Sequence, residues 1–169
     1  MARVFRGEFH QKVDGKGRVS IPASFRRVLE AQDPEWQTGK RPRLIVVYGD
    51  ERRRHLECFS INAMEDVDAR IALMPRGSPE RRAMEMLVYT FSQDAEVDED
   101  GRIVLPQKLR DKIGIEGEAY FAGTSDTFQI WKPETYAAQE KARLSNVLGA
   151  LPEGADEFSF LPELPAKGG

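Results

Sequence analysis

Two short segments of the sequence place an aspartate four residues before an arginine, with glycine immediately before that arginine. They are Asp14-Gly15-Lys16-Gly17-Arg18 and Asp98-Glu99-Asp100-Gly101-Arg102. An aspartate at the start of such a turn can accept backbone N–H bonds, and glycine supplies the positive φ of a tight return. An arginine held on a rigid hairpin loses little entropy when its guanidinium binds a phosphate or the O6/N7 edge of guanine. The spacing also allows a structural role, in which each aspartate pairs with the arginine of its own turn, and spacing alone favours that role.

The charges around the two turns differ in sign. Within the first 27 residues the acidic side chains are Glu8 and Asp14, and the basic ones are Arg3, Arg6, Lys12, Lys16, Arg18, Arg26 and Arg27. Arg102 is instead crowded by three carboxylates, whose field repels phosphate. We therefore expect the first turn to dominate contact with nucleic acid, and the second to contribute less or to serve assembly. The candidate DNA-binding residues are Arg18, Lys16, Arg102, Lys12 and Arg6, and the candidate turn-organising residues are Asp14, Gly17, Asp98 and Gly101.

The whole chain is acidic, with a formal net charge of −3, but this charge is unevenly distributed. Residues 1–54 carry +6 and residues 55–169 carry −9. Such asymmetry points weakly to a nucleic-acid-binding face joined to an acidic remainder. Uneven surface solvation explains the charge distribution equally well, so charge by itself does not decide between a polyanionic partner and an ordinary surface.

The two turns belong to an internal repeat with an offset of 84 residues. Residues 13–26 align without gaps on residues 97–110, and six of the fourteen pairs are identical. Average composition gives about one identity by chance, so the segments derive from a duplication. The identical pairs are Val13/Val97, Asp14/Asp98, Gly17/Gly101, Arg18/Arg102, Pro22/Pro106 and Arg26/Arg110.

Each copy of the repeat predicts the order strand, turn, strand, helix, strand, turn, strand. β-Branched and aromatic runs at 44–49 and 56–59 correspond to runs at 119–123 and 128–131, with turn residues between them. The helix of each copy is predicted to have proline as its first residue, at Pro22 and Pro106. Its apolar face is Phe25, Val28 and Leu29 in the first copy, and Leu109 and Ile113, ending at Gly114, in the second.

The fold class expected from these elements is mainly β with helices (α+β). Further helices are predicted after Ser78-Pro79, after Pro133, and around 61–71. The expected organisation is a first module at 5–61, a helical connector at 62–93, a second module at 94–136, a C-terminal helix at 137–151 and a mobile acidic tail at 152–169.

Several classes of protein do not fit the sequence. The two histidines, His10 and His55, have no metal-binding spacing with Cys58, and neither a glycine-rich phosphate loop nor a nucleophile elbow is present. We expect no catalytic residues, no metal and no cofactor, and Cys58 to be a buried structural thiol. No apolar run reaches the roughly 20 residues of a membrane helix, and no signal peptide is recognisable, so a cytoplasmic location is expected.

The motif residues resemble one family closely. They are Phe5-Arg6-Gly7-Glu8, Asp14 with Lys16-Gly17-Arg18 and Ser20-Ile21-Pro22, Asp98 with Gly101-Arg102-Ile103 and Leu105-Pro106, and Phe128 with Ile130-Trp131. Over roughly residues 5–145 this pattern is similar to the MraZ family of bacterial transcriptional regulators. Two departures are the four residues before Phe5 and the run Arg52-Arg53-Arg54-His55, which either widens the basic face or forms a solvated loop.

The resemblance implies two AbrB-like domains that form a swapped-hairpin, double-psi-type β-barrel, and ring-shaped homo-oligomers. It implies binding to short G-rich direct repeats of double-stranded DNA in the promoter of the division and cell-wall gene cluster, with repression favoured, and hence association with the nucleoid. By motif match, the family's DNA-contacting arginines fall on Arg18 and Arg102, with Lys16 beside the first. No membrane and no small-molecule substrate are expected. The competing hypothesis is a ring-forming scaffold or adaptor that does not bind DNA specifically.

Overall fold

The computed structural model describes residues 4–168, and the chain divides into two compact units after Pro133. The predicted element order of each copy is confirmed. The first copy contains β1 (Glu8–Lys12), β2 (Arg18–Ser20), α1 (Ala23–Ala31), β3 (Arg43–Val47) and β4 (His55–Phe59). The second copy contains β5 (Ser92–Glu96), β6 (Arg102–Val104), α4 (Gln107–Ile113), β7 (Glu118–Gly123) and β8 (Thr127–Trp131).

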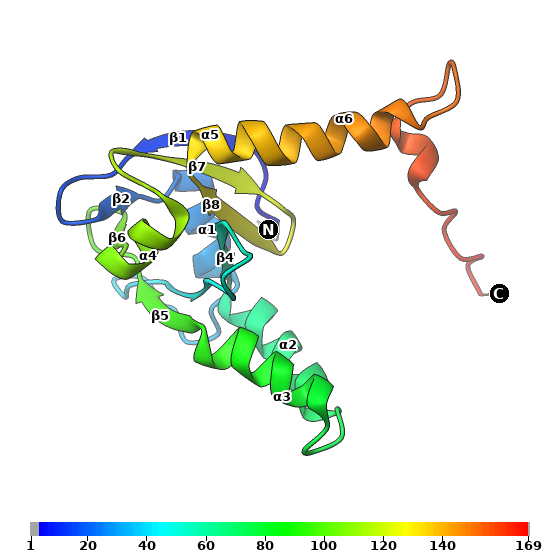
Figure 1. Cartoon of the computed structure of the whole chain (residues 1–169). Helices are drawn as coiled ribbons and strands as arrows, with labels where there is room; N and C mark the ends of the chain where they lie inside the picture. The colour runs from blue at the N-terminus through cyan, green and yellow to red at the C-terminus, as the bar shows by residue number, and fades with distance from the viewer. Residues whose placement is uncertain (1–3, 169) are drawn as a thin grey trace. The chain divides into compact units, whose positions relative to one another are not determined.

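The two copies exchange strands instead of folding separately. Eight strands form a six-stranded antiparallel sheet in the order β1-β7-β8-β4-β3-β5 and a two-stranded ribbon of β2 and β6 (Figure 1). The edge strands β1 and β5 each pair with a strand of the other copy, and β4 and β8 pair at the centre of the sheet. The swapped arrangement that the resemblance implied is therefore visible in the strand pairing.

The α+β class is confirmed, whereas the implied barrel is not closed by hydrogen bonds. Within residues 4–168, the ladder is interrupted because β2 and β6 leave the sheet and pair with each other. A bridge between Val13 and Val19 links β1 to β2 across the first turn. Module boundaries at 5–61 and 94–136 stay a prediction about sequence units, since the strands of both units share one sheet.

One hydrophobic core serves both copies. The side chains of Phe25 and Leu109, from the helices of the two copies, are at most 1% exposed and belong to the same cluster. Phe5 contacts Phe25 and Phe128 edge to face, with ring centroids 5.3 and 5.0 Å apart. Cys58 is fully buried in this core and its pKa is raised by desolvation, so the prediction of a buried structural thiol is confirmed.

The two short helices begin one residue later than predicted, so the proline of each precedes the helix and is not its first residue. Pro22 and Pro106 are N-cap residues with extended ψ values of 139° and 153°, and the helices begin at the next residue. Proline is tolerated there because its carbonyl oxygen still accepts the first N–H bonds, which come from Phe25 and Arg26 in the first copy. Gly114 ends the second helix in the left-handed conformation, as predicted.

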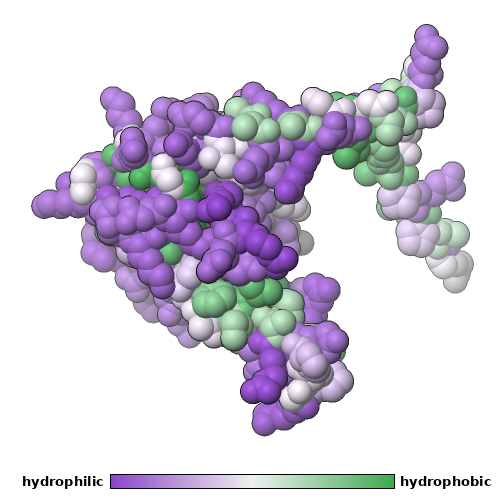
Figure 2. Space-filling view, in the orientation of Figure 1, coloured by the Kyte–Doolittle hydropathy of each residue, from purple (hydrophilic) through white to green (hydrophobic). Residues whose placement is uncertain are grey.

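The connector between the copies is helical, as predicted. It contains α2 (Ile61–Ala72), α3 (Pro79–Glu85) and the π-helical η1 (Met86–Thr90), and the hydroxyls of Ser60 and Ser78 cap α2 and α3. Figure 2 shows apolar surface over the connector helices. Leu73, which follows α2, and Met86 and Tyr89 in η1 are 86%, 53% and 45% exposed.

The remaining helices follow β8. They are α5 (Pro133–Thr135), the π-helical η2 (Tyr136–Glu140), α6 (Lys141–Gly149) and the 3₁₀ turn η3 (Glu157–Phe160). The predicted helix after Pro133 is therefore confirmed, whereas mobility of the acidic tail stays a prediction. None of the helices in the described chain combines the length and hydropathy that a membrane span requires.

A long connection between α1 and β3 is fixed by a buried carboxylate. The side chain of Asp33 is 1% exposed, and its two oxygens accept hydrogen bonds from the guanidinium of Arg43 at 2.7 and 3.0 Å. The backbone N–H of Glu35 donates to the same carboxylate at 3.0 Å. These bonds from Arg43 first, and from the Glu35 backbone next, lower the pKa of Asp33 below its ordinary value of 3.8.

We predict that Asp33→Asn lowers the free energy of unfolding by about 1–3 kcal/mol at neutral pH, because Arg43 loses a charged acceptor. A carboxyl with a lowered folded-state pKa stabilises the fold above its unfolded pKa, and the effect disappears as pH falls through the folded pKa. The difference between wild type and variant in urea unfolding should be constant from about pH 5 to 7 and shrink below about pH 4. Asp126→Asn, in an exposed loop, is the control, and an equal loss there would contradict the assignment.

Candidate nucleic-acid interface

The first Asp-x-x-Gly-Arg turn is closed by its own aspartate. One carboxylate oxygen of Asp14 accepts the backbone N–H groups of Lys16 at 3.0 Å and of Arg18 at 2.9 Å. The other oxygen accepts Nε of Arg18 at 2.6 Å. The backbone N–H of Arg18 and its guanidinium lower the pKa of the Asp14 carboxyl. These bonds tie the backbone of the turn and the side chain of Arg18 to one carboxylate.

The second turn repeats this backbone geometry with a different guanidinium contact. Asp98 accepts the backbone N–H groups of Asp100 at 2.9 Å and Arg102 at 3.0 Å, and the Arg102 bond is the main cause of the lowered pKa of Asp98. Nε of Arg102 lies 3.8 Å from Asp98 and is buried without a hydrogen-bond partner among the described residues. Nη2 of Arg102 contacts Asp100 at 3.1 Å. The acidic residues of this turn therefore engage its arginine directly.

The β2–β6 ribbon brings the two turns together. Arg18 pairs with Val104 and Ser20 pairs with Arg102, so both arginines alternate with the buried Val19 and Ile103. Because successive side chains of a strand point to opposite faces, Arg18, Ser20, Arg102 and Val104 share the outward face of the ribbon. The Arg18 and Arg102 side chains are 38% and 31% exposed, so each is ion-paired within its turn yet reachable from solvent.

Each glycine of the turns holds the ribbon by a contact with the other copy. The carbonyl oxygen of Gly17 accepts the N–H of Leu105 at 2.7 Å, and that of Gly101 accepts the N–H of Ile21 at 2.8 Å. Gly17 and Gly101 have φ values of +83° and +77°. A Cβ at Gly17 would collide with the carbonyl oxygen of Leu105. Glycine is therefore required both for the backbone conformation and for the approach of the opposite strand.

A pair of arginines missed by the sequence analysis completes these contacts. Arg110 packs against Gly17, where its Nε would lie 2.9 Å from a Cβ, and donates to the carbonyl of Leu105 at 2.9 Å. Arg26 packs against Gly101 with the end of its guanidinium, whose Nη1 is the atom nearest to the position of a Cβ. The signal was present in the repeat, because Arg26 and Arg110 are one of its six identical pairs.

The other predicted basic residues lie at different distances from the ribbon. Lys16 is exposed within the first turn, and Lys12 is exposed at the end of β1 that leads into it. Neither Lys12, Lys16 nor Arg6 forms an ion pair among residues 4–168. Arg6 precedes β1, so the length of that strand, roughly 17 Å, separates it from the turn. Arg3 lies outside the described residues.

The arginine run before β4 is tied to the second copy. Arg52 pairs with Asp50 at 2.8 Å, and Nζ of Lys112 donates to the carbonyl oxygens of Asp50 and Arg53 at 2.8 and 2.7 Å. Burial, and then the charges of Arg54 and Arg53, lower the pKa of Lys112. Nearby, His55 stacks on Trp131 with ring centroids 4.5 Å apart. The loop that contains this run is therefore anchored to the second copy through the hydrogen bonds that Lys112 donates to its backbone carbonyls.

No group of three or more His, Cys, Asp or Glu side chains in residues 4–168 is placed to hold a metal ion. The described geometry supplies guanidinium and ammonium groups on a two-stranded ribbon. Such groups bind anions and base edges.

Comparison with known proteins places these features in one family. The sequence model of the family described as "MraZ protein, putative antitoxin-like" matches residues 4–86 and 89–150. The chain is similar to the "Transcriptional regulator MraZ" of Ruegeria sp. (strain TM1040), with 56% identity over 95% of this chain and 96% of the relative. It is 55% identical to the protein of the same name from Ruegeria pomeroyi, over the same shares of both chains. The similarity extends to Roseiflexus castenholzii, at 30% identity over 92% and 94% of the two chains.

We predict that Gly17→Ala lowers the free energy of unfolding by roughly 2 kcal/mol or more, because it combines a positive φ with a backbone collision. Gly15→Ala is a matched control in the same turn, since no atom lies within 4 Å of a Cβ there and its φ is not in the left-handed region. Thermal or urea unfolding of the two variants measures the difference. Equal stability of the two variants would show that the cross-copy contact at Gly17 is not required.

Proposed function

The chain belongs to the MraZ family, and from this membership we propose that it is a transcriptional regulator that binds double-stranded DNA through its β2–β6 ribbon. The observation that carries the proposal is the shared outward face of Arg18 and Arg102, which come from two separate turns. A two-stranded ribbon fits the major groove of B-DNA, where arginine reads guanine through O6 and N7. Membership of a family of transcriptional regulators also confirms the expectation that the chain is not an enzyme.

The ion pair in the first turn orients Arg18 and leaves donors for DNA. Asp14 accepts Nε, and the two terminal Nη groups of Arg18 make no hydrogen bond to the described residues. An arginine whose stem is fixed by a supporting carboxylate presents a pre-organised fork, so the entropy lost on binding is small. The structural and the DNA-binding roles of Arg18 are therefore compatible.

The basic residues divide into three groups by their surroundings. Lys16 and Arg18, at the tip of the first turn, are the principal contacts in our proposal. Lys12 flanks them and reaches neighbouring phosphates, and Arg6 contributes more remotely. Arg102 faces Asp98 and Asp100, which compete with phosphate for its guanidinium, so its contribution is smaller.

An oligomer reconciles one small contact surface with specific binding. A single ribbon reaches few phosphates, and copies joined in a ring engage successive sites through their high effective concentration. The exposed apolar side chains of Leu73, Met86 and Tyr89 support subunit contact through the α2–α3 region. We propose that the homo-oligomeric ring binds short G-rich direct repeats in the promoter of the division and cell-wall gene cluster and represses it. The chain is then cytoplasmic and associated with the nucleoid.

We predict that Lys16→Ala weakens binding to a duplex of tandem G-rich repeats and reduces the slope of log affinity against log salt by about 1. Arg18→Ala should weaken binding by roughly tenfold or more, because a bidentate contact with guanine contributes about 1–3 kcal/mol. Fluorescence anisotropy with salt titration measures both effects. Arg143→Ala, whose side chain on α6 is 76% exposed, is the control and should bind as wild type.

The scaffold hypothesis makes the opposite prediction for the same variants. If Lys16→Ala and Arg18→Ala bind DNA as wild type does while Arg18→Ala dissociates the oligomer in analytical ultracentrifugation, the basic turn serves assembly and the DNA-binding proposal is wrong. Loss of DNA binding with an intact oligomer supports the proposal. Lys16 is informative here because it has no ion pair within residues 4–168 whose loss could disturb the fold.

A further inference from the structure

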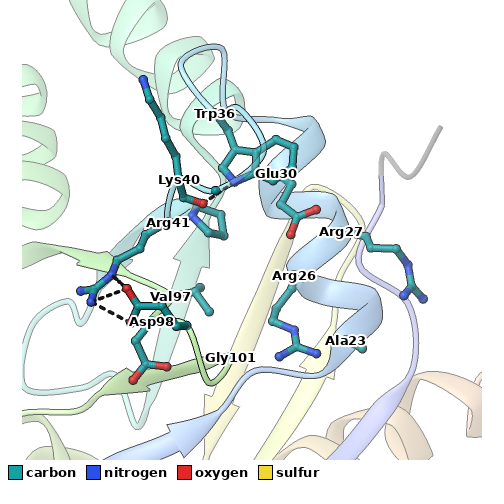
Figure 3. A pocket seen from close by; sticks show the side chains of 13 residues that line it. Ala23, Arg26, Arg27, Glu30, Trp36, Lys40, Arg41, Val97, Asp98 and Gly101 are labelled. Carbon is teal, nitrogen blue, oxygen red and sulfur yellow. Dashed lines mark hydrogen bonds and ion pairs between the residues drawn. The ribbon is translucent and has the colours of Figure 1, made fainter.

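The first copy contains a connection that the second lacks, and it walls a pocket. Residues 32–42 join α1 to β3, whereas residues 114–117 join α4 to β7. The longer connection, α1 and the second turn line an open pocket of about 510 Å³, a volume within the range of small-ligand sites (Figure 3). Because the shorter connection has no counterpart of this wall, the pocket breaks the symmetry of the repeat.

The wall is rigid and leaves an aromatic ring available. The indole N–H of Trp36 donates to the carbonyl of Lys40 at 2.8 Å, and Arg41 makes two bonds to Glu99 at 2.9 and 2.8 Å. The buried Asp33 holds the beginning of the connection. Trp36 is therefore fixed in position with its only polar group satisfied, so its remaining capacity is stacking and apolar contact.

The pocket contains both cations that can bind an anion and a carboxylate that can accept hydrogen bonds. Arg41 and Glu99 pair with each other, and Asp98 accepts the backbone N–H groups of Asp100 and Arg102. Within residues 4–168, no carboxylate pairs with Arg26, Arg27 or Lys40, and no cation pairs with Glu30. In Figure 3 the carboxylate of Glu30 lies between Trp36 and Arg26, and the side chain of Lys40 points away from them. The free groups are thus an aromatic ring, one carboxylate and several cations.

We propose that this pocket binds a guanine nucleotide. Trp36 stacks on the base, as aromatic side chains do with unpaired bases. Glu30 accepts hydrogen bonds from the ring N–H and the exocyclic amino group of guanine, and adenine does not present this pair of adjacent donors. Arg26, whose guanidinium lies inside the pocket, binds the phosphates, and Lys40 and Arg27 add positive charge on either side of it. This ligand uses the free ring, the free acceptor and the free donors together.

The site goes beyond DNA binding and does not depend on it. Its walls are α1, the 32–42 connection and the outer side of the second turn, and its lining excludes Lys16 and Arg18. Nucleotide binding can therefore be measured on the full chain without DNA. Success or failure of that experiment leaves the proposed function separately testable.

The test is a titration of the full chain with GDP, ADP and inorganic phosphate. Binding is monitored by calorimetry and by the quenching of tryptophan fluorescence that a base stacked on Trp36 should cause. The chain has two tryptophans, and Trp131 is only 3% exposed. The fluorescence quench therefore reports on Trp36 and should vanish in Trp36→Phe. We expect saturable binding of GDP, with ADP and phosphate weaker by roughly tenfold or more, because a carboxylate hydrogen-bonded to the base discriminates strongly. Glu30→Gln should remove most of the preference for GDP, and Glu65→Gln, on α2, should retain it.

Three outcomes would overturn the proposal. They are no saturable quench by GDP at millimolar concentrations, equal affinity for GDP and ADP, and an unchanged GDP preference in Glu30→Gln. Equal affinities would mean that the cations attract phosphate without reading a base. Thermal unfolding of each variant confirms that it is folded, and the ratio of GDP to ADP affinity in wild type decides the proposal even if Glu30→Gln does not fold.

Discussion

The structure depends on a reciprocal exchange of hydrogen bonds between the two copies of the repeat. The carbonyl oxygen of each turn glycine, Gly17 or Gly101, accepts an N–H from the strand end of the opposite copy, at 2.7 or 2.8 Å. These bonds exist because glycine permits both the left-handed backbone and the close approach of a second chain segment. Each glycine carbonyl finds its hydrogen-bond donor in the other copy, so duplication and strand exchange are two aspects of one arrangement.

The same exchange explains how the candidate interface is built. Two hairpin tips that are 84 residues apart in the sequence become neighbours on the β2–β6 ribbon, because β2 and β6 pair in antiparallel register. Val19 and Ile103 anchor the ribbon in the core, and the alternation of strand side chains turns Arg18 and Arg102 outward. Rigidity at the tips follows from the aspartates, whose carboxylates each accept two backbone N–H groups.

An acidic chain can bind a polyanion when its charges are separated in space. The net charge of −3 is the sum of a basic first turn, an acidic second turn and an acidic C-terminal part. Binding responds to the local potential within a Debye length, about 8–10 Å at moderate salt. Lys12, Lys16 and Arg18 lie within or beside one turn, and the acidic residues Asp98 and Asp100 largely occupy the other arginine. The two copies have therefore kept one backbone and diverged in their electrostatics.

The sequence alone determined the repeat, the order of its elements and the family, because these depend on local spacing and periodicity. It also left two roles open for Arg18. The tertiary structure decided what distant residues do to each other: the strand exchange, the pairing of β2 with β6, the packing of Arg26 and Arg110 on the opposite glycines, and the pocket at Trp36 and Glu30. Residue spacing cannot supply these contacts, since each joins segments whose proximity is created by burying one shared hydrophobic core.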